Sequence, residues 1–172
     1  MKSLYVKSVI IAGLIAMLLS TSCLNGEVID TFTAENERMQ MMDYLNELRK
    51  GGYKVDSTAM GVYYVVREEG MGAFPKKGDT LSVKYAGYLI NGQMFDASFR
   101  HNVDSTFHFV LREPDMIPGW DNMMEHMNTG MLTEFIVPSN LAYGSQGSYP
   151  GIPPYSSLIF VASLDSIRPK NP

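Results

Sequence analysis

The stretch TLSVKYAGYLINGQMFDAS, residues 80–98, decides the fold class. Thr80 to Ile90 alternates in character and is rich in residues that favour strands, so it predicts a β-strand. Asn91-Gly92 follows and is the strongest short signal for a hairpin turn. Gln93 to Phe95 then begins a return strand. The stretch therefore predicts two antiparallel neighbours in a sheet.

Four further strands flank this hairpin, and they are predicted over Val62 to Arg67, Thr106 to Leu111, Met131 to Val137 and Leu158 to Ile167. One short helix is predicted over residues 119–127, after Ile117-Pro118. Ala142 to Ser157 contains six glycine and proline residues and is typical of a long loop. Strands dominate and no βαβ alternation is present, which indicates an α+β fold with an antiparallel sheet.

A helix is predicted before the sheet, over Thr33 to Lys50. Thr33 fits the N-cap, acidic residues occupy the first turn, and Gly51-Gly52 ends the helix. Its apolar side chains follow helical spacing, and they are Met41, Tyr44, Leu45 and Leu48. Such a stripe predicts a packing face, which lies either on the domain itself or against a second copy of the chain.

The first 22 residues have the pattern of a secretory signal peptide. Lys2 and Lys7 form a short basic start, and Val9 to Leu19 is an eleven-residue apolar run that ends in small residues before Cys23. The run is too short for a permanent membrane-spanning helix. We therefore expect residues 1–22 to be removed from the mature chain.

Cys23 is the only cysteine, and it stands where the signal would be cleaved. This position resembles a bacterial lipoprotein signal, although Ser20 replaces the Leu that is usual three residues before the cysteine. The resemblance implies lipidation of Cys23 and a tether over residues 23–32. The alternative is ordinary cleavage after Ser22, which would leave a free thiol.

The composition is that of a globular protein, with 45% apolar and 19% charged residues, and it excludes a disordered chain. Cleavage at residue 22 would remove two lysines and no acidic residue, which lowers the net charge from −4 to −6. This acidic balance does not favour nucleic acid as a partner. The three histidines lack the spacing of a metal site, and no second cysteine is present.

Seven short motifs follow one another over about 80 residues, and they are Val83–Gly87, Met94–Ser98, Phe107–Leu111, Met116–Trp120, Ala142–Gly144, Ile152–Pro154 and Leu158–Phe160. Together they resemble the FKBP-type peptidyl-prolyl cis–trans isomerases. The resemblance implies an FKBP-like domain over residues 62–167, in which an antiparallel sheet wraps around one short helix. An N-terminal helix and linker (33–61) would precede it, and a tail (168–172) would follow.

The resemblance also implies a pocket with Trp120 as its floor and the Asp96 carboxylate at its rim. The Tyr143 hydroxyl and the backbone N–H of Ile117 would meet substrate carbonyl groups. The residues implied to act in isomerisation are Asp96, Tyr143, Tyr85, Phe95 and Trp120, and those implied to bind substrate are Phe107, Met116, Ile117, Ile152 and Phe160. No cofactor or metal is implied. Phe109 is expected in the core and His108 in solvent.

The chemistry of amide rotation agrees with such a pocket. No bond must break, so no nucleophile, base or metal is needed, and a dry aromatic site favours a twisted amide over a planar one. Taken singly, however, Trp120 and the strand phenylalanines would be ordinary core residues, and Asp96 would be a turn cap. The combination of motifs favours the functional interpretation.

The loop Ser145–Gly151 departs from the family, because it has no histidine and carries glycine where better-known members have a second aliphatic residue. This leaves a proline-binding chaperone or assembly module of low activity as an alternative. A purely structural lipoprotein is a third hypothesis, against which the retention of Asp96 and Tyr143 argues.

The expected partners follow from these hypotheses. They are proline-containing unfolded or extended polypeptides, macrolide-type FKBP ligands, and a membrane reached through the lipid anchor. The expected location is the bacterial cell envelope, with the lipid in the outer membrane and the domain facing the periplasm.

Overall fold

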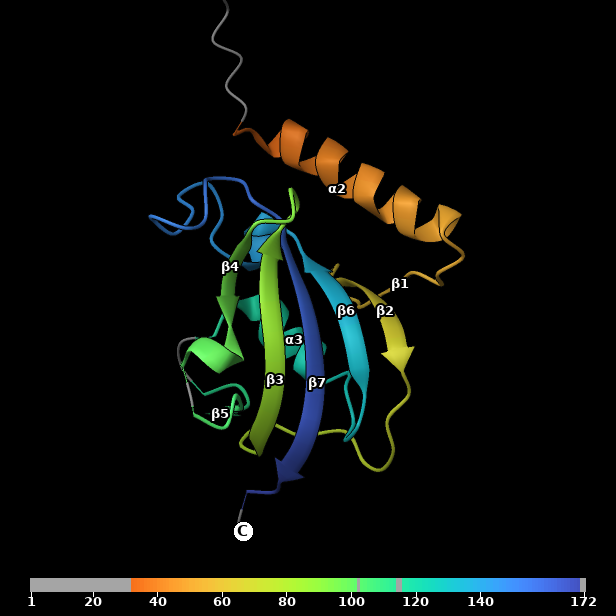
Figure 1. Cartoon of the computed structure of the whole chain (residues 1–172), viewed down its shortest axis with the longest axis vertical. Helices are drawn as coiled ribbons and strands as arrows, with labels where there is room; N and C mark the ends of the chain where they lie inside the picture. Colours follow the sequence, from red (N-terminus) through yellow and green to blue (C-terminus); the bar gives the residue numbers. More distant parts are fainter. Residues whose placement is uncertain (1–31, 102, 114–115, 171–172) are drawn as a thin grey trace, which may run out of the picture. The chain divides into compact units, whose positions relative to one another are not determined.

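The computed structural model describes residues 32–101, 103–113 and 116–170 (Figure 1). The expected signal peptide, the lipidation at Cys23 and nearly all of the tether lie outside these residues. Within them, no helix is both long enough and apolar enough to cross a membrane.

Seven strands form one antiparallel sheet. They are β1 (Asp56–Ser57), β2 (Tyr63–Glu68), β3 (Thr80–Leu89), β4 (Met94–Ala97), β5 (Phe107–Val110), β6 (Leu132–Val137) and β7 (Leu158–Arg168). The order across the sheet is β1-β2-β6-β7-β3-β4, and β5 also pairs with β3. The α+β class with an antiparallel sheet is confirmed.

The β3–β4 hairpin forms where the opening stretch predicts it. Ala86 pairs with Ala97 and Gly87 with Asp96 across the two strands. The turn is closed by the Leu89 N–H, which donates to the Gln93 carbonyl at 2.8 Å, and Gly92 adopts a φ of +85°. That left-handed conformation suits glycine, which explains the residue at this position.

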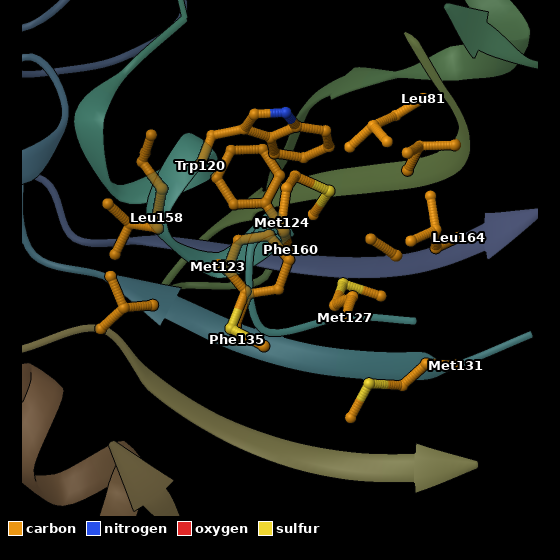
Figure 2. Close-up of a cluster of buried hydrophobic side chains, with 14 of the residues drawn as sticks. Leu81, Trp120, Met123, Met124, Met127, Met131, Phe135, Leu158, Phe160 and Leu164 are labelled. Carbon is orange, nitrogen blue, oxygen red and sulfur yellow. The ribbon is translucent and has the colours of Figure 1, made fainter. Parts of the chain in front are cut away.

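The inner face of the sheet wraps around helix α3 (Pro118–Met124). Figure 2 shows Trp120, Met123 and Met124 of this helix directed toward Phe135 of β6 and Phe160 of β7. All five side chains are at most 5% exposed. Because alternate residues of a strand face opposite sides, the neighbours of Phe135 and Phe160 are directed to the outer face.

Helix α2 (Ala34–Lys50) covers that outer face. Thr33 is its N-cap and accepts a hydrogen bond from the Asn36 N–H at 3.2 Å. The helix buries Met41, Leu45 and Leu48, and these side chains pack with Val65, Ile136 and Ile159 of the sheet. Of the two alternatives for its apolar stripe, the structure shows packing on the domain itself.

The structure differs from the sequence predictions mainly at element ends. Strand β1 was not predicted, because two residues are too few to show a period of two. Helix α3 ends at Met124 and not at residue 127, since residues 125–126 form a turn. Strand β4 continues past Phe95 to Ala97. Two short 3-10 turns, Ser98–Arg100 and Ser139–Leu141, were also not predicted.

Candidate active site

A cavity of about 300 Å³ opens between the sheet and helix α3. Its lining comes from β3, β4, β5, β7, the start of α3 and the loop between β6 and β7. The lining residues are Tyr85, Phe95, Asp96, His101, Phe107, Met116, Ile117, Trp120, Tyr143 and Phe160. Six of these ten side chains belong to phenylalanine, tyrosine or tryptophan, so most of the wall is apolar.

Trp120 is the most buried aromatic side chain of the cavity, at 2% exposed. Its ring meets Tyr85 at a centroid distance of 5.1 Å and Phe160 at 5.2 Å, both in edge-on geometry. Such edge-to-face contacts favour a fixed ring orientation. Gly119 allows this placement, because a Cβ there would lie 2.3 Å from Cγ1 of Val137.

Gly87 makes room for the Phe95 side of the cavity. A Cβ at Gly87 would lie 2.6 Å from Cζ of Phe95 and 3.1 Å from Cε1 of Phe160. Those two rings pack edge-on at 5.6 Å. The absence of a side chain at Gly87 therefore sets where both rings lie.

Asp96 is held by three hydrogen bonds at the cavity rim. Its Oδ2 accepts from the Tyr85 hydroxyl at 2.6 Å, and its Oδ1 accepts from the Ala97 N–H at 2.8 Å and contacts His101 Nε2 at 2.6 Å. Burial alone would raise the pKa of Asp96, but the bonds from Tyr85 and His101 outweigh it and lower that pKa. The carboxylate is therefore charged at neutral pH.

Tyr85 and Tyr143 both keep their protons at neutral pH. Burial raises the pKa of Tyr85, and the hydrogen bond to Asp96 raises it further. Burial and the charge of Asp96 also raise the pKa of Tyr143. Tyr143 is 40% exposed, so its hydroxyl is a donor that a ligand in the cavity can reach.

The comparisons with known proteins agree with this geometry. Residues 72–165 match the family model of the FKBP-type peptidyl-prolyl cis-trans isomerases. The chain belongs to this family.

Its relatives include the FKBP-type isomerase FkpA of Escherichia coli, which is 38% identical over 70% of this chain and 42% of its own length. The isomerase Mip of Coxiella burnetii is 37% identical over 67% of this chain and 49% of its own length. The chain thus spans about half the length of these curated relatives. A crystal structure of a peptidyl-prolyl isomerase from Pseudomonas syringae matches 81% of this chain and 96% of that chain, with a TM-score of 0.67 and 29% identity.

The FKBP-type pocket contains nine of the ten residues that the sequence motifs indicated. The exception is Ile152, which does not line this cavity and is instead 8% exposed in the core cluster. Its backbone pairs with Ser148 in an isolated bridge, through hydrogen bonds of 2.7 and 2.8 Å. Ile152 packs in the same cluster as Trp120 and Phe160 of the cavity, and its contact with substrate stays a prediction.

His101 was not predicted as a site residue. The sequence shows only a histidine five positions after Asp96, and the 3-10 turn between them brings the two side chains together. A polar pair at the end of an irregular turn has no periodic signal that would reveal it. His108 is exposed as expected, whereas Phe109 is partly buried, stacks on Phe107 and packs against the core cluster.

No group of three or more histidine, cysteine, aspartate or glutamate side chains in the described part of the chain could hold a metal ion. The cavity instead offers an apolar chamber with one charged group and two hydroxyls at its edge. This arrangement can hold a small apolar ring and contact adjacent carbonyl groups.

Proposed function

We propose that this protein is a peptidyl-prolyl cis–trans isomerase that accelerates rotation about X–Pro bonds in polypeptides folding outside the cytoplasm. The observation that carries the proposal is the convergence of Tyr85, Phe95, Trp120 and Phe160 on one cavity beside the charged Asp96. Membership of the isomerase family supports the same assignment.

The apolar wall explains how such a site lowers the rotation barrier. Uncatalysed amide rotation faces a barrier of about 18–20 kcal/mol. In the twisted state the amide loses resonance and carries less charge separation, so an apolar chamber favours it relative to water. The proline ring would lie on the indole of Trp120, and the edge-on contacts of Tyr85 and Phe160 hold that indole in place.

The polar groups at the rim would orient the substrate. The Tyr143 hydroxyl and the backbone N–H of Ile117 would each donate to a substrate carbonyl, and Asp96 would lie near the carbonyl of the proline. Placed donors of this kind select the twisted geometry without covalent chemistry.

A proline-limited refolding assay tests the activity. We expect the wild-type protein to accelerate the slow phase, and Tyr143→Phe and Asp96→Ala to lower kcat/KM by about tenfold each, which corresponds to the net free energy of about one hydrogen bond. Exposed Met39→Ala on α2 is the matched control and should keep full activity. A wild-type protein that leaves the slow phase unchanged would contradict the proposal.

A second candidate is a chaperone or assembly module that binds proline-containing segments with little turnover. The departures of the Ser145–Gly151 loop favour it, and none of the residues that line the cavity comes from that loop. This candidate predicts saturable binding of a proline peptide without faster cis–trans exchange. Measurement of both quantities on one peptide separates the two candidates.

The location proposed for the domain is the periplasmic side of a bacterial outer membrane, through a lipid on Cys23. The support is the sequence pattern of residues 1–23. Expression in a bacterial host with labelled fatty acid should label the wild type and not Cys23→Ser. Equal absence of label in both would contradict the anchor and leave the isomerase proposal intact. Extended proline-containing chains and macrolide-type ligands are the partners that the cavity would accept.

A further inference from the structure

The loop of residues 138–157 carries Tyr143 and connects β6 to β7. Its backbone is organised around the carbonyl of Ser139. That carbonyl accepts from the N–H of Ala142 at 2.9 Å and from the N–H of Gly144 at 2.8 Å. The two residues on either side of Tyr143 are thus both bonded to one atom, so the position of Ser139 determines the position of Tyr143.

Ser139 is in turn held by Glu37, which lies in the first turn of α2. Oε1 of Glu37 accepts from the Ser139 N–H at 2.6 Å, and Oε2 accepts from the Ser139 hydroxyl at 2.5 Å. Oε1 also accepts from the Ser157 hydroxyl at 2.7 Å, at the other end of the loop. Ser139 and Ser157 are 4% and 3% exposed.

These bonds are of the strong kind. Each joins a carboxylate to a neutral donor, and each is shielded from water by the burial of the two serines. One side chain of α2 therefore ties together both ends of the loop, over sequence separations of 102 and 120 residues. In Figure 1 the start of α2 accordingly lies at the end of the sheet where this loop leaves β6 and returns to β7.

We infer that Glu37 is a positioning residue for the active site, which fixes Tyr143 over the cavity through Ser139 and Ser157. The inference rests on the proposed function for its kinetic consequence. Its structural consequence, a loop that loosens when the carboxylate is removed, does not depend on activity.

The helix offers a matched control in Tyr44. Its hydroxyl donates to Oε1 of Glu134 on β6 at 2.5 Å, so it is a second polar contact between α2 and the sheet. Glu134 also pairs with Arg67 of β2, and neither of these two contacts involves the 138–157 loop. Tyr44→Phe therefore weakens the docking of α2 without touching the loop.

The experiment compares Glu37→Ala, Glu37→Gln and Tyr44→Phe in the full mature protein. Alanine is a good helix former, so α2 itself is preserved. Glutamine keeps an acceptor oxygen of the same reach. We expect Glu37→Ala to lower kcat/KM by roughly tenfold, which is the effect of losing about one strong hydrogen bond. Glu37→Gln should retain most of the wild-type kcat/KM. Tyr44→Phe should keep kcat/KM within about twofold, which is the variation expected of a site that does not contact the loop.

Two further readouts separate positioning from general stability. Hydrogen exchange of the Gly144 amide should be faster in Glu37→Ala and unchanged in Tyr44→Phe. In a Tyr143→Phe background, Glu37→Ala should cost little additional activity, because the hydroxyl that it positions is already absent. Coupling of this kind is what a double-mutant cycle measures.

The inference is overturned if Gly144 exchange is unchanged in Glu37→Ala, if Tyr44→Phe reduces activity as much as Glu37→Ala does, or if the losses from Glu37→Ala and Tyr143→Phe multiply independently. If wild-type protein shows no isomerase activity, the proposed function fails. Gly144 exchange and the affinity for a proline peptide then decide the inference about Glu37 by themselves.

Discussion

Asp96 shows how one residue combines charge and position. The hydrogen bonds that lower the pKa of Asp96 come from Tyr85, His101 and the Ala97 N–H, so the same contacts that keep it charged also fix its orientation. A group whose folded-state pKa is depressed stabilises the fold above its unfolded pKa, and this stabilisation is lost as the pH falls through the folded value.

Tyr85→Phe removes one of these donors. We expect the pKa of Asp96 to rise toward its ordinary value near 3.9, and the variant to lose stability relative to wild type above that pH. Below both pKa values the difference should vanish. NMR titration of the Asp96 carboxyl carbon and urea unfolding at several pH values provide the two measurements. An unchanged Asp96 titration would show that the Tyr85 hydroxyl does not stabilise the carboxylate.

Gly87 is a second residue that shapes the cavity, because it lacks a Cβ atom. Gly87→Ala places a methyl group 2.6 Å from Cζ of Phe95, so we expect the Phe95 ring to shift and the protein to lose about 1–3 kcal/mol, as typical of overpacked sites. The reshaped cavity should also bind a proline peptide more weakly.

Gly151→Ala is the control for that change, because a Cβ there would meet only Cβ of Phe95, at 4.0 Å. Thermal unfolding measures the stability of both variants, and peptide titration measures their affinity for a proline peptide. Equal affinities for Gly87→Ala and wild type would mean that the Phe95 ring does not set the cavity shape.

At the scale of elements, the sequence predicted the regular strands and helices well. Strand β3 and helix α2 follow clear periods of two and 3.6, the Asn91-Gly92 turn indicates the partner of β3, and all three elements lie where the sequence indicates. The nine cavity residues came from ordered motifs and not from periodicity. His101 was missed because it follows an irregular turn, where local hydrogen bonds decide the direction of a side chain.

The docking of α2 is an element-scale prediction. Leu45 is fully buried in the contact between the helix and the sheet, so Leu45→Ala should cost about 2–5 kcal/mol in the free energy of unfolding. Met39→Ala on the exposed side of the same helix should change it by less than about 0.5 kcal/mol. Urea unfolding measures both. A small loss in Leu45→Ala would contradict the packing of α2 on the sheet.

The domain from residue 32 to residue 170 places its two helices on opposite faces of one sheet. Helix α3 and the inner face build the cavity, whereas α2 covers the outer face and reaches the cavity only through the loop that it holds at Ser139 and Ser157. Under the proposed function, the aromatic chamber and its charged rim would favour rotation about the X–Pro bond without bond cleavage. The family match over residues 72–165 covers the cavity residues and does not include α2.

The central claim is that this cavity accelerates rotation about the X–Pro bond. NMR exchange spectroscopy on a short X–Pro peptide measures that rotation directly, without a folding client. The account predicts a cis–trans exchange rate that rises in proportion to the concentration of wild-type protein, and that falls by about tenfold with Tyr143→Phe. An exchange rate equal to that of the peptide alone, at protein concentrations that saturate the peptide, would contradict it.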